Sequence, residues 1–387
     1  MINLPPRPFK QIEVGDDDPF VANALRPRKH YEPCWCGSAR KFKNCHRVRG
    51  DLSPVAAGQL LHEQRRIFWQ SRGCMHPLAG PSTCNGPVID AHTIQRKGPL
   101  AKIADETGHV MCFDTSSSPG RAEISSRGWR KASTFPGYCQ KHDSSLFEPL
   151  EKLRFTGTHE QCVLQAFRNI CNELYRKRAL VESLEFQRDM LDRGRSLDQQ
   201  ISIQMSIFKN LEGQRKSIEE NDDVRQQFED AISTGNYEKF SSRCYFFTGE
   251  LEVVSSAILQ CEFDFCGTQL TDLWDLDLDA DLLSHSVMET ESGGAIVFVW
   301  PSDAKNATRS VQSFDQIPTE SKGDIFVQYC FLQSENTYFS KAWWNRLPPT
   351  NKDLIRRLAN SLYYDGGAFK ACDTKLVNWT MASVDTI

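Results

Sequence analysis

The hydrophobic and polar positions of residues 88–153 predict a strand and a helix around which the chain is organised. Residues 88–94 are rich in β-forming side chains, and Pro87 excludes a mid-helix position just before them. They therefore predict a strand that delivers His92 at its end. Residues 139–153 follow Pro136-Gly137 and space their leucines for a helix. The pattern thus predicts a strand-borne imidazole facing the first turn of a helix.

The later part of the chain changes from helical to mixed patterning. Residues 158–233 predict an antiparallel helical hairpin that breaks at Asp192-Arg193-Gly194, with a third helix beginning near Val224. Beyond Tyr237 the pattern is α+β, and Gly249-Glu250 predicts a hairpin turn between two strands. The remaining expected elements are helices over 55–72, 95–105, 325–332 and 354–362, and strands over 108–113, 243–248, 251–259 and 295–300.

The composition indicates a globular chain of two or three domains. The 387 residues suffice for substantial cores, and no apolar run reaches the length of a membrane span. The N-terminus, Met-Ile-Asn-Leu-Pro-Pro, has no signal-peptide pattern. Fourteen cysteines without an export signal favour a reducing compartment, with thiols that are buried or metal-bound. We therefore expect a cytoplasmic protein with no membrane partner.

The net charge of −4 conceals an uneven distribution. Residues 1–150 hold 21 Lys+Arg against 14 Asp+Glu, whereas the remainder holds 25 against 36. A basic segment attracts phosphate, so nucleic acid contact is favoured over the alternative that zinc-bound thiolates need cationic neighbours. A polar insertion over 116–130 predicts a substrate-contacting loop. The candidate nucleic-acid-binding residues are Arg96, Lys97, Arg127, Arg130 and Lys131.

A compact set of metal-ligand residues lies near the N-terminus. Cys34-x-Cys36, eight residues and then Cys45-His46 supply four ligands for one tetrahedral zinc ion. The segment resembles the SEC-C zinc motif, whose members usually have glycine at the position of Ala39. Because four ligands leave no open coordination position, the motif is expected to dock proteins or nucleic acid rather than to catalyse.

The segment from Cys74 to Leu150 resembles the HNH endonucleases, in the branch written Ala-His-x-Ile. The resemblance implies a ββα-metal fold in which His92 is the general base and Asp143 binds a catalytic Mg²⁺ or Mn²⁺ ion. It also implies a structural zinc ion, so that the chain holds two; the ligands of this second zinc would be Cys74, Cys84, Cys139 and His142.

The chain departs from the HNH pattern at several positions. Ala91 stands where the family places a metal-binding aspartate, so Asp90 or a water molecule takes over that role. Nine residues separate Cys74 from Cys84 where the family has two, and no asparagine is clearly the middle letter of the motif. A register one residue earlier remains open, in which His142 binds the catalytic metal instead of zinc.

Two functions of different class follow. The first is a metal-dependent endonuclease or nickase acting on DNA, by analogy in prokaryotic anti-phage defence; the second is a zinc-stabilised adaptor for nucleic acid or protein that has lost catalysis. Other proteins could bind through the SEC-C motif, the hairpin or the C-terminal domain, and a homo-oligomer stays open. The expected organisation is a flexible arm (1–26), the SEC-C motif (27–50), an HNH-like domain (51–155), a coiled-coil-like helical hairpin (156–236) and an α+β domain without a recognised role (237–387).

Overall fold

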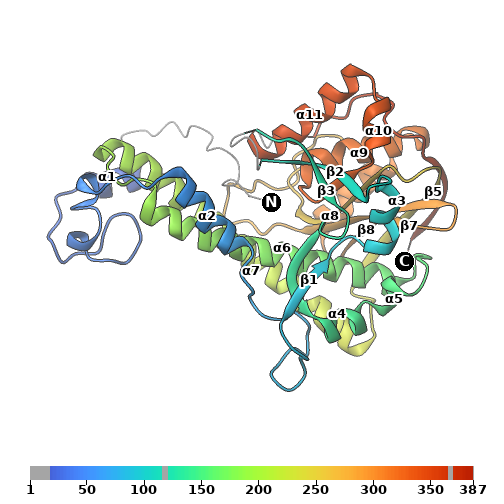
Figure 1. Ribbon diagram of the computed structural model, residues 1–387, viewed down its shortest axis with the longest axis horizontal. Helices are drawn as coiled ribbons and strands as arrows, with labels where there is room; N and C mark the ends of the chain where they lie inside the picture. Colours follow the sequence, from blue (N-terminus) through green and yellow to red (C-terminus); the bar gives the residue numbers. More distant parts are fainter. Residues whose placement is uncertain (1–17, 116–120, 365–368, 387) are drawn as a thin grey trace. The chain divides into compact units, whose positions relative to one another are not determined.

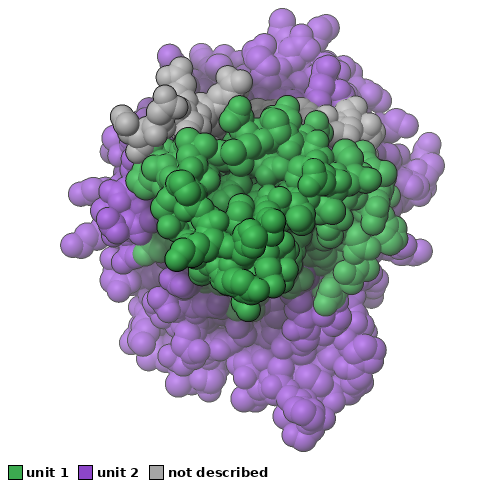
Figure 2. Space-filling view, turned by 90° about the vertical axis from the view of Figure 1, so that its left-hand side faces the viewer, with its two compact units in different colours: residues 1–70, 176–218 green, residues 71–175, 219–387 purple. Residues whose placement is uncertain are grey.

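The computed structural model describes residues 18–115, 121–364 and 369–386. Helices and antiparallel sheets are both present, so the predicted mixed α and β composition is confirmed (Figure 1). Figure 2 colours two compact units separately. Unit 1 comprises the described residues up to Gln70 together with Arg176–Ile218. Unit 2 comprises those of Ser71–Tyr175 and Glu219–Ile387.

Unit 1 is helical and includes parts of two long helices. Its elements are α1 (Pro19–Leu25), the 3₁₀ turns η1 (Phe42–Asn44) and η2 (Arg49–Asp51), α2 (Ala57–Phe68), and portions of α6 (His159–Met190) and α7 (Leu197–Thr234). Val21 and Ala24 of α1 are buried against Ile201 and Met205 of α7. Residues 19–25 are therefore a packed helix, which corrects the expected flexible arm for that stretch. Residues 1–17 of the arm lie outside the described residues.

The two long helices contact each other within unit 1 through an apolar seam. Leu184 of α6 packs with Ile207 and Leu211 of α7, and all three side chains are buried. The turn that joins the helices covers residues 191–196, which includes the predicted break at Asp192-Arg193-Gly194. The third helix predicted from Val224 was wrong, because α7 continues without interruption to Thr234.

Unit 2 contains two antiparallel sheets. A two-stranded sheet pairs β1 with β4, and an eight-stranded sheet has the order β10-β5-β8-β7-β6-β9-β2-β3. The strands are β1 (Val88–His92), β2 (His109–Asp114), β3 (Glu123–Gly128), β4 (Thr134–Cys139), β5 (Phe240–Thr248), β6 (Val253–Gln260), β7 (Leu282–Glu289), β8 (Gly293–Pro301), β9 (Thr337–Phe339) and β10 (Thr380–Thr386).

The other helices of unit 2 are short. They are the π-helical turn η3 (Arg96–Leu100), α3 (Ala101–Ile103), α4 (Gln140–Leu146), α5 (Glu148–Glu151), α8 (Lys305–Asp315), η4 (Thr319–Ser321), α9 (Lys322–Gln333), α10 (Lys341–Arg346) and α11 (Pro349–Tyr364). Within the described residues, no helix combines the length and the apolarity needed to cross a bilayer.

The sheet order corrects two expectations. The predicted hairpin across Gly249-Glu250 was wrong, because β5 pairs with β8 and β10, whereas β6 pairs with β7 and β9. Local turn residues cannot reveal such long-range pairing. The expected loop over 116–130 contains β3, whereas residues 116–120 are outside the described part. Because β2 pairs with β9, the expected 51–155 segment shares a sheet with the C-terminal part of the chain.

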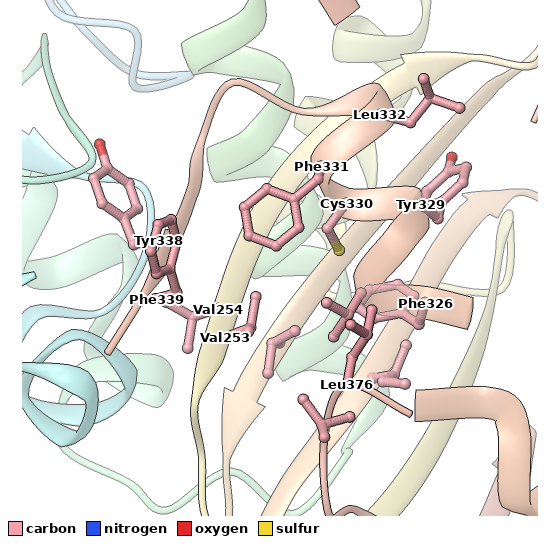
Figure 3. Packing of buried hydrophobic residues seen from close by; sticks show 14 of the residues in the cluster. Val253, Val254, Phe326, Tyr329, Cys330, Phe331, Leu332, Tyr338, Phe339 and Leu376 are labelled. Atoms are coloured by element: carbon pink, nitrogen blue, oxygen red, sulfur yellow. The ribbon is translucent and has the colours of Figure 1, made fainter. Parts of the chain in front are cut away.

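The core of unit 2 is built around α9. Most α9 side chains are buried, and Phe331, which Figure 3 shows in the cluster with Phe339 of β9, has its ring centroid 5.6 Å from that of Phe339. Trp343 is fully buried and stacks with Phe331. The aromatic pair at 343–344 therefore packs in the core.

Candidate functional site

The first cluster of metal-ligand side chains is Cys34, Cys36, Cys45 and His46. Their ligand atoms all lie within 4.8 Å of one another, and all four residues are buried. The Cys36 and Cys45 sulfurs are 3.7 Å apart, and His46 Nδ1 is 3.2 Å from the Cys34 sulfur. Four converging N and S donors in a closed, dry setting fit a structural zinc ion.

Local backbone geometry brings these ligands together. The Cys34 N–H donates to the Arg40 carbonyl at 2.7 Å, and residues 33 and 41 form an antiparallel bridge. The turn between them requires left-handed backbone at Gly37, with φ 75°, and at Ala39, with φ 58°. Glycine adopts this region freely and alanine does so only with strain, which explains why a glycine is usual at the position of Ala39 in the resemblance.

The imidazole of His46 must lose a proton for metal binding. Burial lowers its pKa, but hydrogen bonds from its ring to Asp192, Cys34 and Cys45 outweigh burial and raise the pKa to about 10. The ring nitrogen that faces the thiols is Nδ1. Zinc binding therefore competes with protons at this nitrogen and strengthens as the pH rises.

The second cluster is Cys74, Cys84, Cys139 and His142. Its four ligand atoms also lie within 4.8 Å of one another. His142 Nδ1 is 3.4 Å from the Cys74 sulfur and 3.6 Å from the Cys84 sulfur. The nine residues between the first two cysteines form a loop of turns that returns Cys84 to Cys74. The donor set fits a second zinc ion, and it places His142 with the thiols.

Hydrogen bonds and ring stacking hold this second set in place. The Cys139 backbone N–H points at the Cys74 sulfur at 3.4 Å, and Asn85 accepts from the Lys141 backbone N–H at 3.0 Å. The ring of His76 stacks on that of His142 with centroids 4.0 Å apart. Burial acts to raise the pKa of Cys139, but backbone hydrogen bonds to His142 and Asn85 outweigh it and lower that pKa.

His92 is positioned by the small sheet. It is the last residue of β1, which pairs antiparallel with β4 so that His92 lies opposite Thr134. Helix α4 follows β4 directly and carries His142 and Asp143 in its first turn. The strand that delivers His92 is thus paired with the strand that leads into the helix. Asp90 is exposed, and Ala91 is 2% exposed.

One nitrogen of the His92 imidazole lacks a hydrogen-bond partner in the described chain. Its pKa is lowered to about 4, mainly by burial and also by Arg96 and Arg168, whereas Glu151 and a hydrogen bond to the backbone of Trp129 act in the opposite direction. Nε2 is buried and has no hydrogen-bond partner among the described residues. A neutral imidazole nitrogen without a partner carries a lone pair that can accept a proton.

Asp143 shares the electrostatic surroundings of His92. Its pKa is raised above the ordinary value, mainly by burial and also by Glu151, whereas Arg168 acts in the opposite direction. Asp143 Oδ1 is buried without a hydrogen-bond partner in the described part of the chain. Arg168, whose side chain is 1% exposed, donates to Glu151 at 2.9 Å and lies 4.0 Å from the Phe147 ring centroid. The described chain therefore supplies no hydrogen-bond partner for this carboxylate oxygen.

The ligand atoms of His92, Asp90 and Asp143 do not form a third compact cluster. Among the described residues, only the two Cys/His sets bring three or more such atoms within 4.8 Å. An ion at Asp143 would therefore take most of its ligands from water and substrate, as Mg²⁺ commonly does.

The cationic candidates fall into two groups. Arg96, Lys97, Arg130 and Lys131 are exposed. Arg127 differs, because it donates to the buried carboxylate of Asp114 at 3.0 Å and its side chain is 18% exposed. Arg127 therefore contributes to the packing of β2 on β3, which leaves the other four as the freely accessible cations of the set.

Three residues that lie beside the candidate site residues were not predicted from the sequence. Arg168 and Glu151 adjoin His92 and Asp143, and Asp192 accepts from His46 Nε2 at 2.6 Å. Arg168 has a weak signal in the sequence, since a charge beside the apolar positions 167 and 170 of a buried helix needs a partner. Asp192 has no local signal, because it is 146 positions from His46.

Comparison with known families supports the first cluster alone. The family model of the SEC-C motif matches residues 32–47, which include Cys34, Cys36, Cys45 and His46. Neither the search of curated proteins nor that of solved structures found a match to the chain. The SEC-C motif and the presence of two Cys/His clusters suited to zinc are thus established.

Proposed function

We propose that the protein is a metal-dependent endonuclease of the HNH type that hydrolyses phosphodiester bonds in DNA. Support comes from the chain order of β1, β4 and α4, with a Cys/His set at the start of the helix and His92 at the end of the paired strand. The zinc ion of that set would stabilise a small unit that has little core of its own.

The observation that carries the proposal is the hydrogen-bonding state of His92. Its Nε2 is buried and has no hydrogen-bond partner within the described chain. A neutral imidazole with an oriented lone pair can take a proton from the attacking water. Because the pKa of His92 is depressed to about 4, the ring is unprotonated at neutral pH. An anionic phosphate beside it would raise that pKa toward the operating range.

Asp143 would supply the carboxylate oxygen that holds the catalytic cation. A bound Mg²⁺ or Mn²⁺ ion supplies positive charge to the scissile phosphate. Asp143 is ionised more readily when a cation neutralises it, which offsets the effect of its burial. Asp90 lies two residues before His92 on the same face of β1, and its exposure leaves it accessible to water.

DNA contact is assigned to the exposed cations around the site. Arg96 acts on the charge state of His92, and Lys97 follows it directly. Arg130 and Lys131 precede β4 and are also exposed. Cations of this kind bind the phosphate backbone and contribute affinity without sequence preference. Arg127 is left out of this surface because Asp114 engages it.

A second function has specific support. Ala91 is buried at the position where the HNH pattern has a metal-binding aspartate. The guanidinium of Arg168 acts on both His92 and Asp143, and it is a permanent cation that competes with a metal ion. These two features favour an inactive zinc-stabilised adaptor that binds nucleic acid or protein.

Metal-dependent cleavage of plasmid DNA distinguishes the two functions. We expect nicking or linearisation in Mg²⁺ or Mn²⁺ and none with a chelator that spares the structural zinc. Asp143→Ala should abolish cleavage, with partial recovery at higher Mn²⁺. Glu148→Ala is the matched control, because that carboxylate is exposed and pairs with Lys152. Folded, zinc-loaded protein that binds DNA but never cleaves it would favour the adaptor.

A further inference from the structure

The imidazole of His46, in the SEC-C cluster, is paired with a carboxylate from a distant part of the chain. His46 Nε2 is 2.6 Å from Asp192 Oδ2, and both side chains are at most 1% exposed. His46 Nδ1 faces the Cys34 and Cys45 sulfurs at 3.2 and 3.3 Å, and a metal ion bound at Nδ1 would leave the proton on Nε2, which then donates to the carboxylate. This is the arrangement in which a carboxylate orients a metal-binding histidine and increases its basicity.

Asp192 is itself fixed by further donors. Its Oδ2 accepts from Gln204 Nε2 at 2.8 Å, and its Oδ1 accepts from Arg49 Nη1 at 3.2 Å. Arg49 also reaches the Cys45 sulfur at 3.4 Å, and its side chain is 4% exposed. A buried carboxylate with donors on both oxygens has little freedom to rotate, so it holds the His46 ring in one orientation.

The same segments are joined away from the imidazole. Gly194 donates its backbone N–H to the Arg49 carbonyl at 3.1 Å, and Arg40 forms an ion pair with Asp189. The Cα of Gly37 lies close to Phe208, because a Cβ there would sit 3.2 Å from that ring. The metal cluster thus lies in the core of unit 1 and is not a free module.

We propose that Asp192 completes the SEC-C metal centre of this protein as the positioning carboxylate of His46, and that metal binding thereby fastens the turn between α6 and α7. The protein's own α6–α7 turn therefore covers the SEC-C cluster on the side of His46. Zinc occupancy and the order of residues 189–204 are therefore coupled, and this coupling is independent of any hydrolytic activity.

Cadmium replacement provides a site-resolved test on the full-length protein. With ¹¹³Cd in both clusters, the NMR spectrum should contain two resonances, and Asp192→Ala should move only one. Competition with a chelator should show that the metal affinity of this site falls about 10- to 100-fold. Asp192→Asn retains an acceptor oxygen toward His46 Nε2 and should lose less. The second cluster serves as the internal reference.

Arg40→Ala is the matched control. It removes a side-chain contact between the same two segments, but the Arg40 side chain is half exposed, and the Arg40 carbonyl that accepts from Cys34 is retained in the variant. We expect its metal affinity to stay within about twofold of the wild type. An equal loss of affinity in Arg40→Ala and Asp192→Ala would overturn the proposal, because packing alone would then account for it. Unchanged affinity in Asp192→Ala would overturn it as well.

Two measurements on the wild-type protein remain informative even if Asp192→Ala does not fold. ¹⁵N NMR of the zinc-bound protein should show His46 with a protonated Nε2 and a metal-bound Nδ1. Hydrogen exchange should become faster at residues 189–204 as well as 34–46 when zinc is removed, while β8 stays unchanged. Metal binding through Nε2, or unchanged exchange at residues 189–204, would contradict the proposal.

Discussion

Burial of His92 makes a quantitative prediction about its protonation. Its pKa is lowered from 6.5 to about 4, with burial as the leading cause and Arg96 and Arg168 as further causes. The difference corresponds to about 3 kcal/mol between the two protonation states. The ring should therefore be almost entirely neutral at pH 7, as a general base requires.

The same pKa difference makes the contribution of His92 to the free energy of unfolding depend on pH. Between pH 6.5 and about 4 the unfolded chain binds a proton at this histidine while the folded chain does not. The free energy of unfolding therefore falls as the pH is lowered through this window, by up to about 3 kcal/mol from His92. His92→Asn removes this contribution. The variant should lose less stability than the wild type between pH 7 and pH 4, and metal loss common to both cancels in the comparison.

NMR titration of the histidine ring gives the pKa directly. We expect His92 to titrate near 4, and we expect Arg96→Gln to raise that pKa because it removes an exposed cation without disturbing the core. The pH dependence of unfolding by urea should differ between wild type and His92→Asn in the direction given above. A His92 that titrates near 6.5 in the folded protein would refute the burial argument, as would parallel stability profiles.

Three further predictions concern the metals, the zinc turn and DNA binding. Elemental analysis should find about two zinc ions per chain, with Cys34→Ala and Cys139→Ala each losing a different one; a single zinc that depends on Cys34 alone would exclude the second site. Ala39→Gly should raise the free energy of unfolding by about 0.5–1 kcal/mol in urea denaturation, because the residue has φ 58°; a loss of stability would show that this strain is absent. The double variant Arg130→Gln/Lys131→Gln should weaken DNA binding and reduce the slope of log affinity against log salt by about two, and an unchanged slope would remove both residues from the DNA surface.

The first ligand set could be predicted from the sequence because the spacing of its residues is informative. The four ligands lie within thirteen positions, at Cys34, Cys36, Cys45 and His46. A segment that short can bring four ligands around one zinc ion in only a few conformations. The second set required a resemblance, since Cys74 and Cys139 are far apart in sequence and are brought together by the pairing of β1 with β4 and by hydrogen bonds around it.

The contact of Asp192 with His46 and the strand order of the large sheet could not be predicted, because both depend on long-range packing. Asp192 meets His46 only because α6 and α7 return the chain to the metal cluster, and no local pattern encodes that return. Gly249-Glu250 has the chemistry of a turn, yet the strands on either side separate within the sheet. The choice between neighbouring and distant strands depends on side-chain packing across the sheet rather than on the turn.

The role of His92 in cleavage is the central claim, and a single comparison tests it. The rate of plasmid cleavage in Mg²⁺ should be measured for wild type and His92→Ala at equal zinc content and equal DNA affinity. We predict that His92→Ala lowers the rate by about 10²- to 10⁴-fold, the usual contribution of a general base, because the substitution removes no metal ligand of either zinc cluster. A His92→Ala protein that cleaves at the wild-type rate would contradict the account.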